Sequence, residues 1–219
     1  HQLMKYFESS AKNNNAIFAY NSEVTAIEKQ NRGYKLTVND SDGRTTELLA
    51  EIVVNSAGLY SDKIANMAGM TDYRLYYNKG EYFSVTGTNK YRNILIYPAP
   101  QKKITSLGVH TVVDTGGGLK LGPSSFYVDR IDYTVDENHR HDFFEAVKRF
   151  LTQIKEDDLH PDMAGIRSKL QAPDENEKDF VIREESAAGF PGFINLIGIE
   201  SPGLTSSPAI ADYVNNLVA

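Results

Sequence analysis

The sequence predicts an α+β fold, in which a block of antiparallel strands is inserted between two pieces of an α/β sheet. Residues 1–72 combine helix and strand patterns, whereas residues 73–122 carry almost only strand and turn patterns. The chain then closes with a long helical pattern, a strand and a final helix. Because the end segments supply few strands, we expect residues outside this sequence to complete the α/β sheet.

The first element is a helix whose apolar face is formed by Leu3, Met4, Phe7 and Ala11. No N-cap residue precedes this face, although helices usually begin with one. We therefore expect the chain to be a fragment of a longer polypeptide. The apolar segment 16–20, which follows the helix, carries a short strand signal.

A hairpin and a buried strand are expected next. Residues 23–29 and 33–38 form the hairpin, and residues 40–43 are a turn cluster. Residues 51–55 are apolar enough for a buried strand, which ends in the small residues 56–58. The following helix stops at a glycine, and its apolar face consists of Tyr60, Ile64, Met67 and Ala68.

The middle of the chain is expected to hold a second hairpin and the longest helix. Residues 109–113 and 119–121 are strands joined by a glycine-rich loop. The helix begins at Asp136, and Pro161 ends it. Its apolar stripe consists of Phe143, Phe144, Val147, Phe150, Leu151 and Ile154.

The chain closes with a buried strand at residues 193–197, a turn and an amphipathic helix. Ser207 is expected as the N-cap and Pro208 as the first helical residue. Such a joint presents backbone N–H groups and the positive end of a helix dipole to a negative group. The pattern alone also fits an ordinary connection between a strand and a helix.

Composition excludes several classes of function. The 219 residues carry a formal charge of −6 without a long basic run, which argues against nucleic acid as a partner. The absence of cysteine excludes disulfides, thiolate catalysis and cysteine-bound metal. Neither G-x-G-x-x-G nor G-x-x-x-x-G-K-[ST] occurs, so we do not expect a self-sufficient dinucleotide-binding or P-loop domain.

Two residues are candidates for chemistry. His110 places an ionisable ring in an otherwise apolar strand, and a neutral imidazole can take a proton from a hydroxyl group. Arg167 follows small and apolar residues, and its planar guanidinium can bind a carboxylate through two parallel hydrogen bonds. The same patterns also fit a core histidine and an ion-paired arginine.

Other polar and aromatic residues are expected to be structural. His139 and His141 are two residues apart and do not share a helix face, which favours a solvated surface over a metal site. His160 is expected in a turn. Tyr82 and Tyr97 are strand aromatics, which usually pack. No bound metal is therefore expected.

Several motifs together resemble a known enzyme family. "EIVVNSAGLYSDKIANMAG", "SLGVHTVVDTGGGLKLGPSS", "AGIRSKLQ" and "FINLIGIESPGLTSSPAIADYV" occur in the order seen in FAD-dependent L-2-hydroxyglutarate dehydrogenases/oxidases. This family is part of the D-amino-acid-oxidase-like flavoprotein superfamily, together with glycine oxidase and FAD-linked glycerol-3-phosphate dehydrogenase. Its members begin with a G-x-G-x-x-G segment that holds the FAD pyrophosphate. Since this sequence contains no such motif, we expect the fragment alone to be unable to hold FAD.

The resemblance implies a domain layout and a set of cofactor contacts. Residues 1–72 and 162–219 would be parts of the FAD-binding domain, and residues 73–161 would form an inserted antiparallel-sheet substrate domain. One strand and two loops would contact the FAD, through Val24, Ala57, Gly58, Pro202, Gly203, Leu204, Thr205 and Ser206.

The resemblance also implies oxidation of L-2-hydroxyglutarate, or a similar 2-hydroxy acid, to the 2-oxo acid. Arg167 would hold the substrate carboxylate and His110 would act as the base. Lys79 and Tyr82 would contact the distal carboxylate or the substrate hydroxyl. A quinone, oxygen or another flavoprotein would accept the electrons.

Three alternatives remain open. The first two are an amino-acid or amine oxidase and a glycerol-3-phosphate dehydrogenase of the same superfamily. The third is a catalytically silent, substrate-binding fragment. By analogy with the family, we expect a cytoplasmic location, or a mitochondrial one in a eukaryote, with the full-length protein able to associate with a membrane surface.

Overall fold

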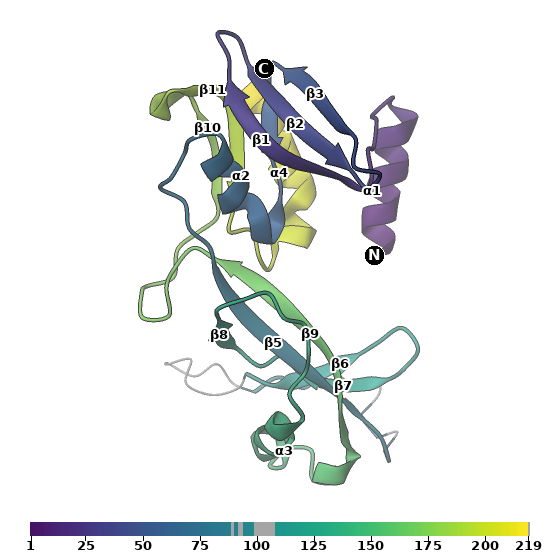
Figure 1. The fold of residues 1–219 in the computed structure, drawn as a ribbon. Coiled ribbons are helices and arrows are strands. Elements are labelled where there is room, and N and C mark those ends of the chain that lie inside the picture. Colours follow the sequence, from purple (N-terminus) through teal and green to yellow (C-terminus); the bar gives the residue numbers. More distant parts are fainter. Residues whose placement is uncertain (89, 92–93, 99–107, 219) are drawn as a thin grey trace.

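The strands that the structure describes form three sheets, which are joined by helices and turns (Figure 1). The structure is a computed structural model that describes residues 1–88, 90–91, 94–98 and 108–218. None of the helices in these ranges is long and apolar enough to cross a membrane. The chain starts with helix α1, Gln2–Asn13, as predicted.

The first sheet is antiparallel and confirms the predicted hairpin. Asp40 ends the second strand, and its carboxylate accepts hydrogen bonds from the backbone N–H groups of Asp42 and Arg44 in the following turn, at 3.0 and 2.8 Å. Such Asx contacts stabilise tight turns. The strands run in the order β1 Ser22–Lys29, β2 Tyr34–Asp40 and β3 Thr45–Ala50.

The second sheet contains a pair of parallel strands, and the C-terminal helix follows one of them. Its order is β10 Val181–Glu185, β11 Phe190–Ile197 and β4 Val53–Asn55. Strands β11 and β4 are parallel, with Asn195 opposite Asn55, and β10 is antiparallel to β11. Helix α2, Ser61–Met67, follows β4, and helix α4, Gly203–Val218, follows β11.

The third sheet is an antiparallel block of five strands in which β5 is central. Strand β5 pairs with β7, β8 and β9, and β6 pairs with β7, which confirms the predicted second hairpin. Helix α3, Arg140–Val147, lies below this sheet, and the other two sheets lie above it (Figure 1). The strands are β5 Tyr76–Val85, β6 His110–Val113, β7 Leu119–Gly122, β8 Phe126–Val128 and β9 Leu159–Lys169.

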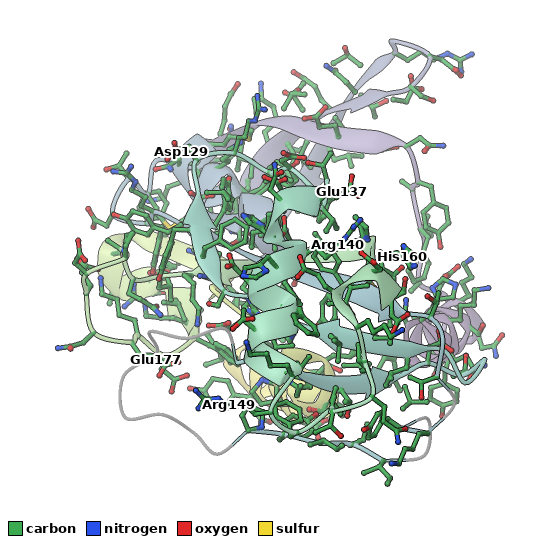
Figure 2. All side chains as sticks on the ribbon, turned by 90° about the horizontal axis from the view of Figure 1, so that it is seen from below. Asp129, Glu137, Arg140, Arg149, His160 and Glu177 are labelled. Atoms are coloured by element: carbon green, nitrogen blue, oxygen red, sulfur yellow. The ribbon has the colours of Figure 1, made fainter. Side chains whose placement is uncertain are left out.

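Two separate hydrophobic clusters of described residues stabilise the two parts of the molecule. One lies between the five-stranded sheet and α3, where the rings of Phe83 and Phe143 are 4.7 Å apart. Figure 2 shows α3 from this side, running from the turn at Glu137 toward Arg149. The other cluster packs α2 against the first two sheets, and its fully buried members include Ala65, Phe193 and Ile197.

The predicted helix from Asp136 to Pro161 is wrong in length. Helix α3 covers only Arg140–Val147, although the predicted apolar residues are still buried or partly buried in the first cluster. Pro161 lies inside β9 rather than at a helix end, and so does His160, whose Nε2 is 3.1 Å from the Thr86 hydroxyl. Proline is tolerated here because, among the described strands, β9 pairs with β5 alone, and because the register shifts at this point.

Two predictions at the chain ends are also wrong. Residues 16–20 form no strand, and the side chain of Ile17 is 95% exposed. Helix α4 begins at Gly203, so Ser207 is no N-cap and Pro208 lies inside the helix. Because Pro208 has no N–H to donate, the Leu204 carbonyl oxygen accepts from the Ser207 hydroxyl instead, at 2.8 Å.

The predicted domain limits at residues 72 and 161 stay a prediction. The five-stranded sheet begins with β5 at Tyr76, close to the first limit, but β9 remains paired with β5 as far as Lys169. The chain therefore leaves the sheet only after Lys169, beyond the second limit.

Candidate active site

Two of the predicted cofactor-binding segments meet at one edge of the second sheet. Ala57 and Gly58 follow the carboxyl end of β4, and residues 202–206 follow the carboxyl end of β11. Because β4 and β11 are parallel neighbours, both segments leave the sheet on the same side. The carboxyl edge of parallel strands is where α/β folds bind their ligands.

Pro202 and the first turn of α4 are open to an approaching ligand. Pro202, Leu204 and Thr205 are exposed, whereas Gly203 is buried. The hydroxyl groups of Thr205 and Ser206 donate to the Pro202 carbonyl oxygen, at 2.9 and 3.1 Å. The first backbone N–H groups of a helix have no partner within that helix, so this end of α4 can receive negative charge.

Val24, the third predicted cofactor contact, lies elsewhere. It is in β1, opposite Val38, and it packs against the second hydrophobic cluster. The structure therefore places Ala57 and Gly58 at the same sheet edge as Pro202 and the start of α4, but it places Val24 in a different sheet.

A chain of buried polar side chains lies beneath this edge. The Asn55 amide donates to Asn195 Oδ1 at 2.8 Å, and the Asn195 amide donates to Glu185 Oε1 at 2.9 Å. The Tyr73 hydroxyl donates to the same oxygen at 2.5 Å. Burial, followed by this hydrogen bond, raises the pKa of Tyr73 to about 12. Sequence reasoning missed these residues, although Asn55 and Asn195 both stand out as amides in apolar strands.

The candidate substrate residues lie on the five-stranded sheet. Arg167 in β9 is opposite Asn78 in β5, and Gly165 is opposite Gly80. Directly opposed residues in an antiparallel pair share a face of the sheet. Tyr82 is two residues beyond Gly80 in β5, so it lies on the same face as Arg167.

The guanidinium of Arg167 is held from two sides. Nη1 donates to Asn78 Oδ1 at 2.8 Å, and Nη1 and Nη2 lie 3.4 and 3.5 Å from the Ser124 carbonyl oxygen. A Cβ atom on Gly80 would lie 2.9 Å from Nη2, so the glycine leaves the space that this guanidinium fills. Among the described residues, no carboxylate forms an ion pair with Arg167, and its positive charge is available for an anion.

His110 lies on the same face, across the hairpin. It is opposite Gly122 in the β6–β7 pair, and a Cβ atom on Gly122 would meet the Tyr82 ring at 2.6 Å. The His110 ring stacks on Tyr97, with 4.2 Å between the ring centroids. His110 Nδ1 is 3.2 Å from the Gly108 carbonyl oxygen. Because a carbonyl only accepts, this contact assigns the proton to Nδ1 and leaves the Nε2 lone pair free in the neutral ring.

Lys79 lies on the opposite face and is not brought near Arg167. Its ammonium group donates to the Thr134 carbonyl oxygen and is 3.3 Å from Glu81 Oε1. His139 Nδ1 is 2.6 Å from the other oxygen of Glu81, whose side chain is fully buried. His139 is therefore part of a half-buried polar cluster and not a solvated histidine, whereas His141 is mainly exposed, as predicted.

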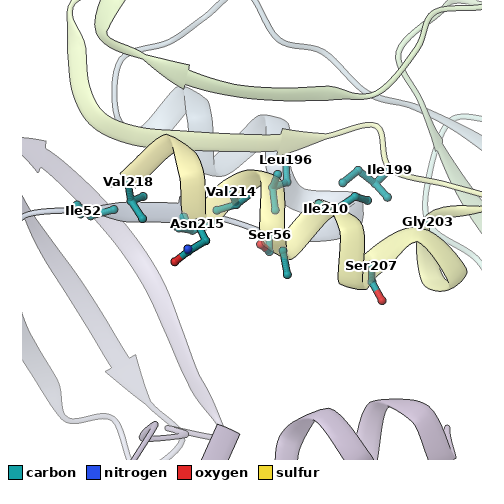
Figure 3. Close-up of a pocket in the computed structure, with 12 residues that line it drawn as sticks. Ile52, Ser56, Leu196, Ile199, Gly203, Ser207, Ile210, Val214, Asn215 and Val218 are labelled. Carbon is teal, nitrogen blue, oxygen red and sulfur yellow. The ribbon is translucent and has the colours of Figure 1, made fainter. Parts of the chain in front are cut away.

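An apolar cavity of about 560 Å³ lies between α4 and the β4–β11 pair (Figure 3). Of the described residues that line it, none is charged. Its walls therefore do not suit a phosphate group. Within the same described ranges, no group of three or more His, Cys, Asp or Glu residues is arranged to hold a metal ion. The aliphatic lining includes Ile52, Val54, Leu196, Ile199, Ile210 and Val214.

Proteins of known function are similar in sequence to this chain. A model of the family described as "FAD dependent oxidoreductase" matches residues 1–217. The mitochondrial L-2-hydroxyglutarate dehydrogenase of Arabidopsis thaliana is 36% identical, over 95% of this chain and 48% of that protein. A glycerol 3-phosphate dehydrogenase of Caloramator mitchellensis is 31% identical, over 96% of this chain and 41% of that protein. The chain thus spans about half the length of the relatives it matches.

Solved structures share the fold. The L-α-glycerophosphate oxidase of Mycoplasma pneumoniae, solved with FAD bound, matches with a TM-score of 0.72 and 23% identity, over 96% of this chain and 53% of that one. Glycine oxidase from Geobacillus kaustophilus matches with a TM-score of 0.65 and 19% identity, over 93% of this chain and 49% of that one. The chain therefore belongs to the FAD-dependent oxidoreductase family and has the fold of the D-amino-acid-oxidase-like flavoproteins.

Proposed function

We propose that the native protein oxidises L-2-hydroxyglutarate, or a similar 2-hydroxy acid, to the 2-oxo acid with FAD as its cofactor. One observation carries the proposal. Arg167 and His110 lie on one face of the five-stranded sheet, and no carboxylate of the described chain neutralises the guanidinium. The 36% identity to a plant L-2-hydroxyglutarate dehydrogenase supports the same substrate class.

The residues present fit the flavin end of FAD. The two loops at the carboxyl edge of β4 and β11 offer backbone groups, and nothing lies within 4 Å of the place a Cβ atom on Gly58 would take. That space allows a planar ring to approach the backbone closely. The chain holds no G-x-G-x-x-G motif for the pyrophosphate, so we propose that the described residues alone do not retain FAD.

Each proposed residue has a defined task. The Arg167 guanidinium would bind the carboxylate next to the hydroxyl-bearing carbon, with the N–H groups that Asn78 and Ser124 leave unused. His110 Nε2 would take the hydroxyl proton. FAD, when bound, supplies the acceptor for the two electrons and the hydrogen that leave this carbon. A quinone, oxygen or another flavoprotein would then reoxidise it.

The test is the kinetics of Arg167→Met in the native polypeptide with FAD bound. The substitution removes the charged hydrogen bonds to the carboxylate, so the KM for L-2-hydroxyglutarate should rise about 100-fold. Arg130, which is exposed, provides the control variant Arg130→Met. An unchanged KM in Arg167→Met would remove this residue from the proposed site.

Glycerol 3-phosphate is the second candidate substrate. A 31% identical relative is a glycerol 3-phosphate dehydrogenase, and the glycerophosphate oxidase shares the fold. A phosphate carries more charge than a carboxylate, and Lys79 is engaged with Glu81 on the far face of the sheet. We therefore favour the carboxylate, and comparison of kcat/KM for the two substrates decides between them.

A further inference from the structure

The strand that carries Arg167 also holds the loop that precedes α4. The Ser168 hydroxyl donates to the Ile199 carbonyl oxygen at 3.2 Å. Lys169 forms an ion pair with Glu200, and these two side chains are only 16% and 15% exposed. An ion pair that is largely shielded from water is screened less than a surface pair. The two residues of β9 that follow Arg167 therefore connect this strand to the loop.

Glu200 fixes the beginning of helix α4 as well. Its backbone carbonyl oxygen accepts a hydrogen bond from the Gly203 N–H at 2.5 Å, while its carboxylate binds Lys169. A Cβ atom on Gly203 would lie 2.3 Å from Ile199 Cγ2, so only glycine lets the helix start this close to the loop. Residues 199–205 surround a small cavity of about 320 Å³.

We propose that Lys169 and Glu200 are positioning residues, which set the place of the loop 199–202 and the start of α4 relative to the Arg167 guanidinium. The proposal rests on the proposed function, because it takes Arg167 as the carboxylate-binding residue and the loop as a cofactor contact. Lys169 is two residues beyond Arg167, so both lie on the same face of β9, roughly 7 Å apart along the strand.

Loss of the Lys169–Glu200 ion pair should lower kcat and leave substrate binding nearly unchanged. Arg167 is held by Asn78 of β5 and by Ser124, and neither contact involves Glu200. Breaking the pair would therefore leave the guanidinium in place while the loop shifts. A displacement of about 1 Å at a reacting centre can cost up to 100-fold in rate.

The first test uses the 219-residue chain without cofactor and measures hydrogen exchange in peptides that span residues 199–206. Lys169→Met should raise the exchange rate of these amides about tenfold, because Glu200 would be left without its partner. The control is Lys120→Met, since Lys120 is 2.6 Å from Asp162 at the other end of β9, with 21% and 25% exposure. Unchanged exchange in Lys169→Met would overturn the proposal.

The second test uses the native polypeptide with FAD bound. Lys169→Met and Glu200→Gln should each lower kcat about tenfold and change KM by less than about threefold, and the double variant should be no worse than either. Lys169→Arg, which keeps the charge, should retain kcat. A raised KM with unchanged kcat would instead make Lys169 a substrate contact and overturn the proposal. If the unmodified protein oxidises no 2-hydroxy acid, the proposed function is wrong. The exchange experiment then still shows whether the Lys169–Glu200 ion pair holds residues 199–206 in place.

Discussion

For single residues, the alternation of side chains along a strand determines which face of the sheet Lys79 lies on. Lys79 and Tyr82 are three positions apart in β5, so a regular strand places them on opposite faces. Tyr82 lies on the face of Arg167, and Lys79 binds Glu81 on the face that packs toward α3. The sequence already contained this signal, because the strand pattern at this point was correctly predicted.

His110 has a stricter requirement than Arg167, because its task depends on which ring nitrogen carries the proton. Replacement of His110 by Ala in the native polypeptide with FAD should lower kcat by about 10²- to 10⁴-fold, the usual contribution of a general base. KM should change little, since Arg167 remains. Steady-state kinetics with L-2-hydroxyglutarate measure both values.

A matched variant tests whether the His110 effect is specific. His141 is 63% exposed and its ring contacts only Glu156 among the described hydrogen-bonding partners. His141→Ala should leave kcat unchanged. Equal rates in His110→Ala and in the unmodified protein would end the role of His110 as base.

At the scale of elements, local patterns predicted the hairpins and failed where tertiary contacts decide. The two hairpins and strand β4 follow from alternation and turn residues, which act over a few positions. The apolar stripe after Asp136 also suits a long helix, yet the segment from Leu159 pairs with β5. Such pairing depends on residues about 80 positions away, for which a local pattern carries no information.

Local sequence patterns also fail to predict which residues of the candidate site come together. Arg167 and His110 were identifiable as isolated polar residues in apolar strands. Their placement on one face depends on the register of β5 with β7 and β9, which includes a shift between Tyr82 and Phe83. The Asn55–Asn195 contact likewise joins strands 140 residues apart.

Gly80 in β5 and Gly165 in β9, which lie opposite each other, allow a prediction about stability. Gly80→Ala would place a methyl group 2.9 Å from both the Arg167 guanidinium and Pro123, so the free energy of unfolding should fall by about 1–3 kcal/mol. Gly165→Ala, directly opposite, meets nothing within 4 Å and should change it by less than about 0.5 kcal/mol. Urea unfolding of both variants measures the difference, and equal losses would contradict this account of Arg167 packing.

At the scale of the whole molecule, the candidate site lies between two hydrophobic clusters. One cluster lies between the five-stranded sheet and α3, and the other packs α2 against the sheet that contains β4 and β11. The five-stranded sheet with α3 and the first two sheets with α2 therefore each have a hydrophobic core of their own. The relative position of the two parts then depends on the few contacts that run between them, of which the Lys169–Glu200 pair is one.

Cofactor retention is a prediction about the whole chain. The described loops offer contacts to a flavin ring, but no segment offers the glycine-rich cradle that a pyrophosphate needs. The purified 219-residue chain should therefore be colourless after incubation with FAD and gel filtration. Flavin absorbance at a stoichiometric level would contradict the prediction, and the native polypeptide treated in the same way provides the comparison.

The buried amide pair between β4 and β11 has a consequence for how the chain folds. If β11 slipped by one residue against β4 so that Asn195 faced Val54 and Asn55 faced Leu196, the hydrogen bond between the two buried amides would be lost, and Asn195 Oδ1 would lose the Asn55 donor. An unsatisfied buried polar group costs about 1–3 kcal/mol, so misaligned pairings are disfavoured before the sheet is complete. The Asn55–Asn195 hydrogen bond thus favours one register of β4 and β11 during folding. This register fixes where the two segments that follow these strands leave the sheet.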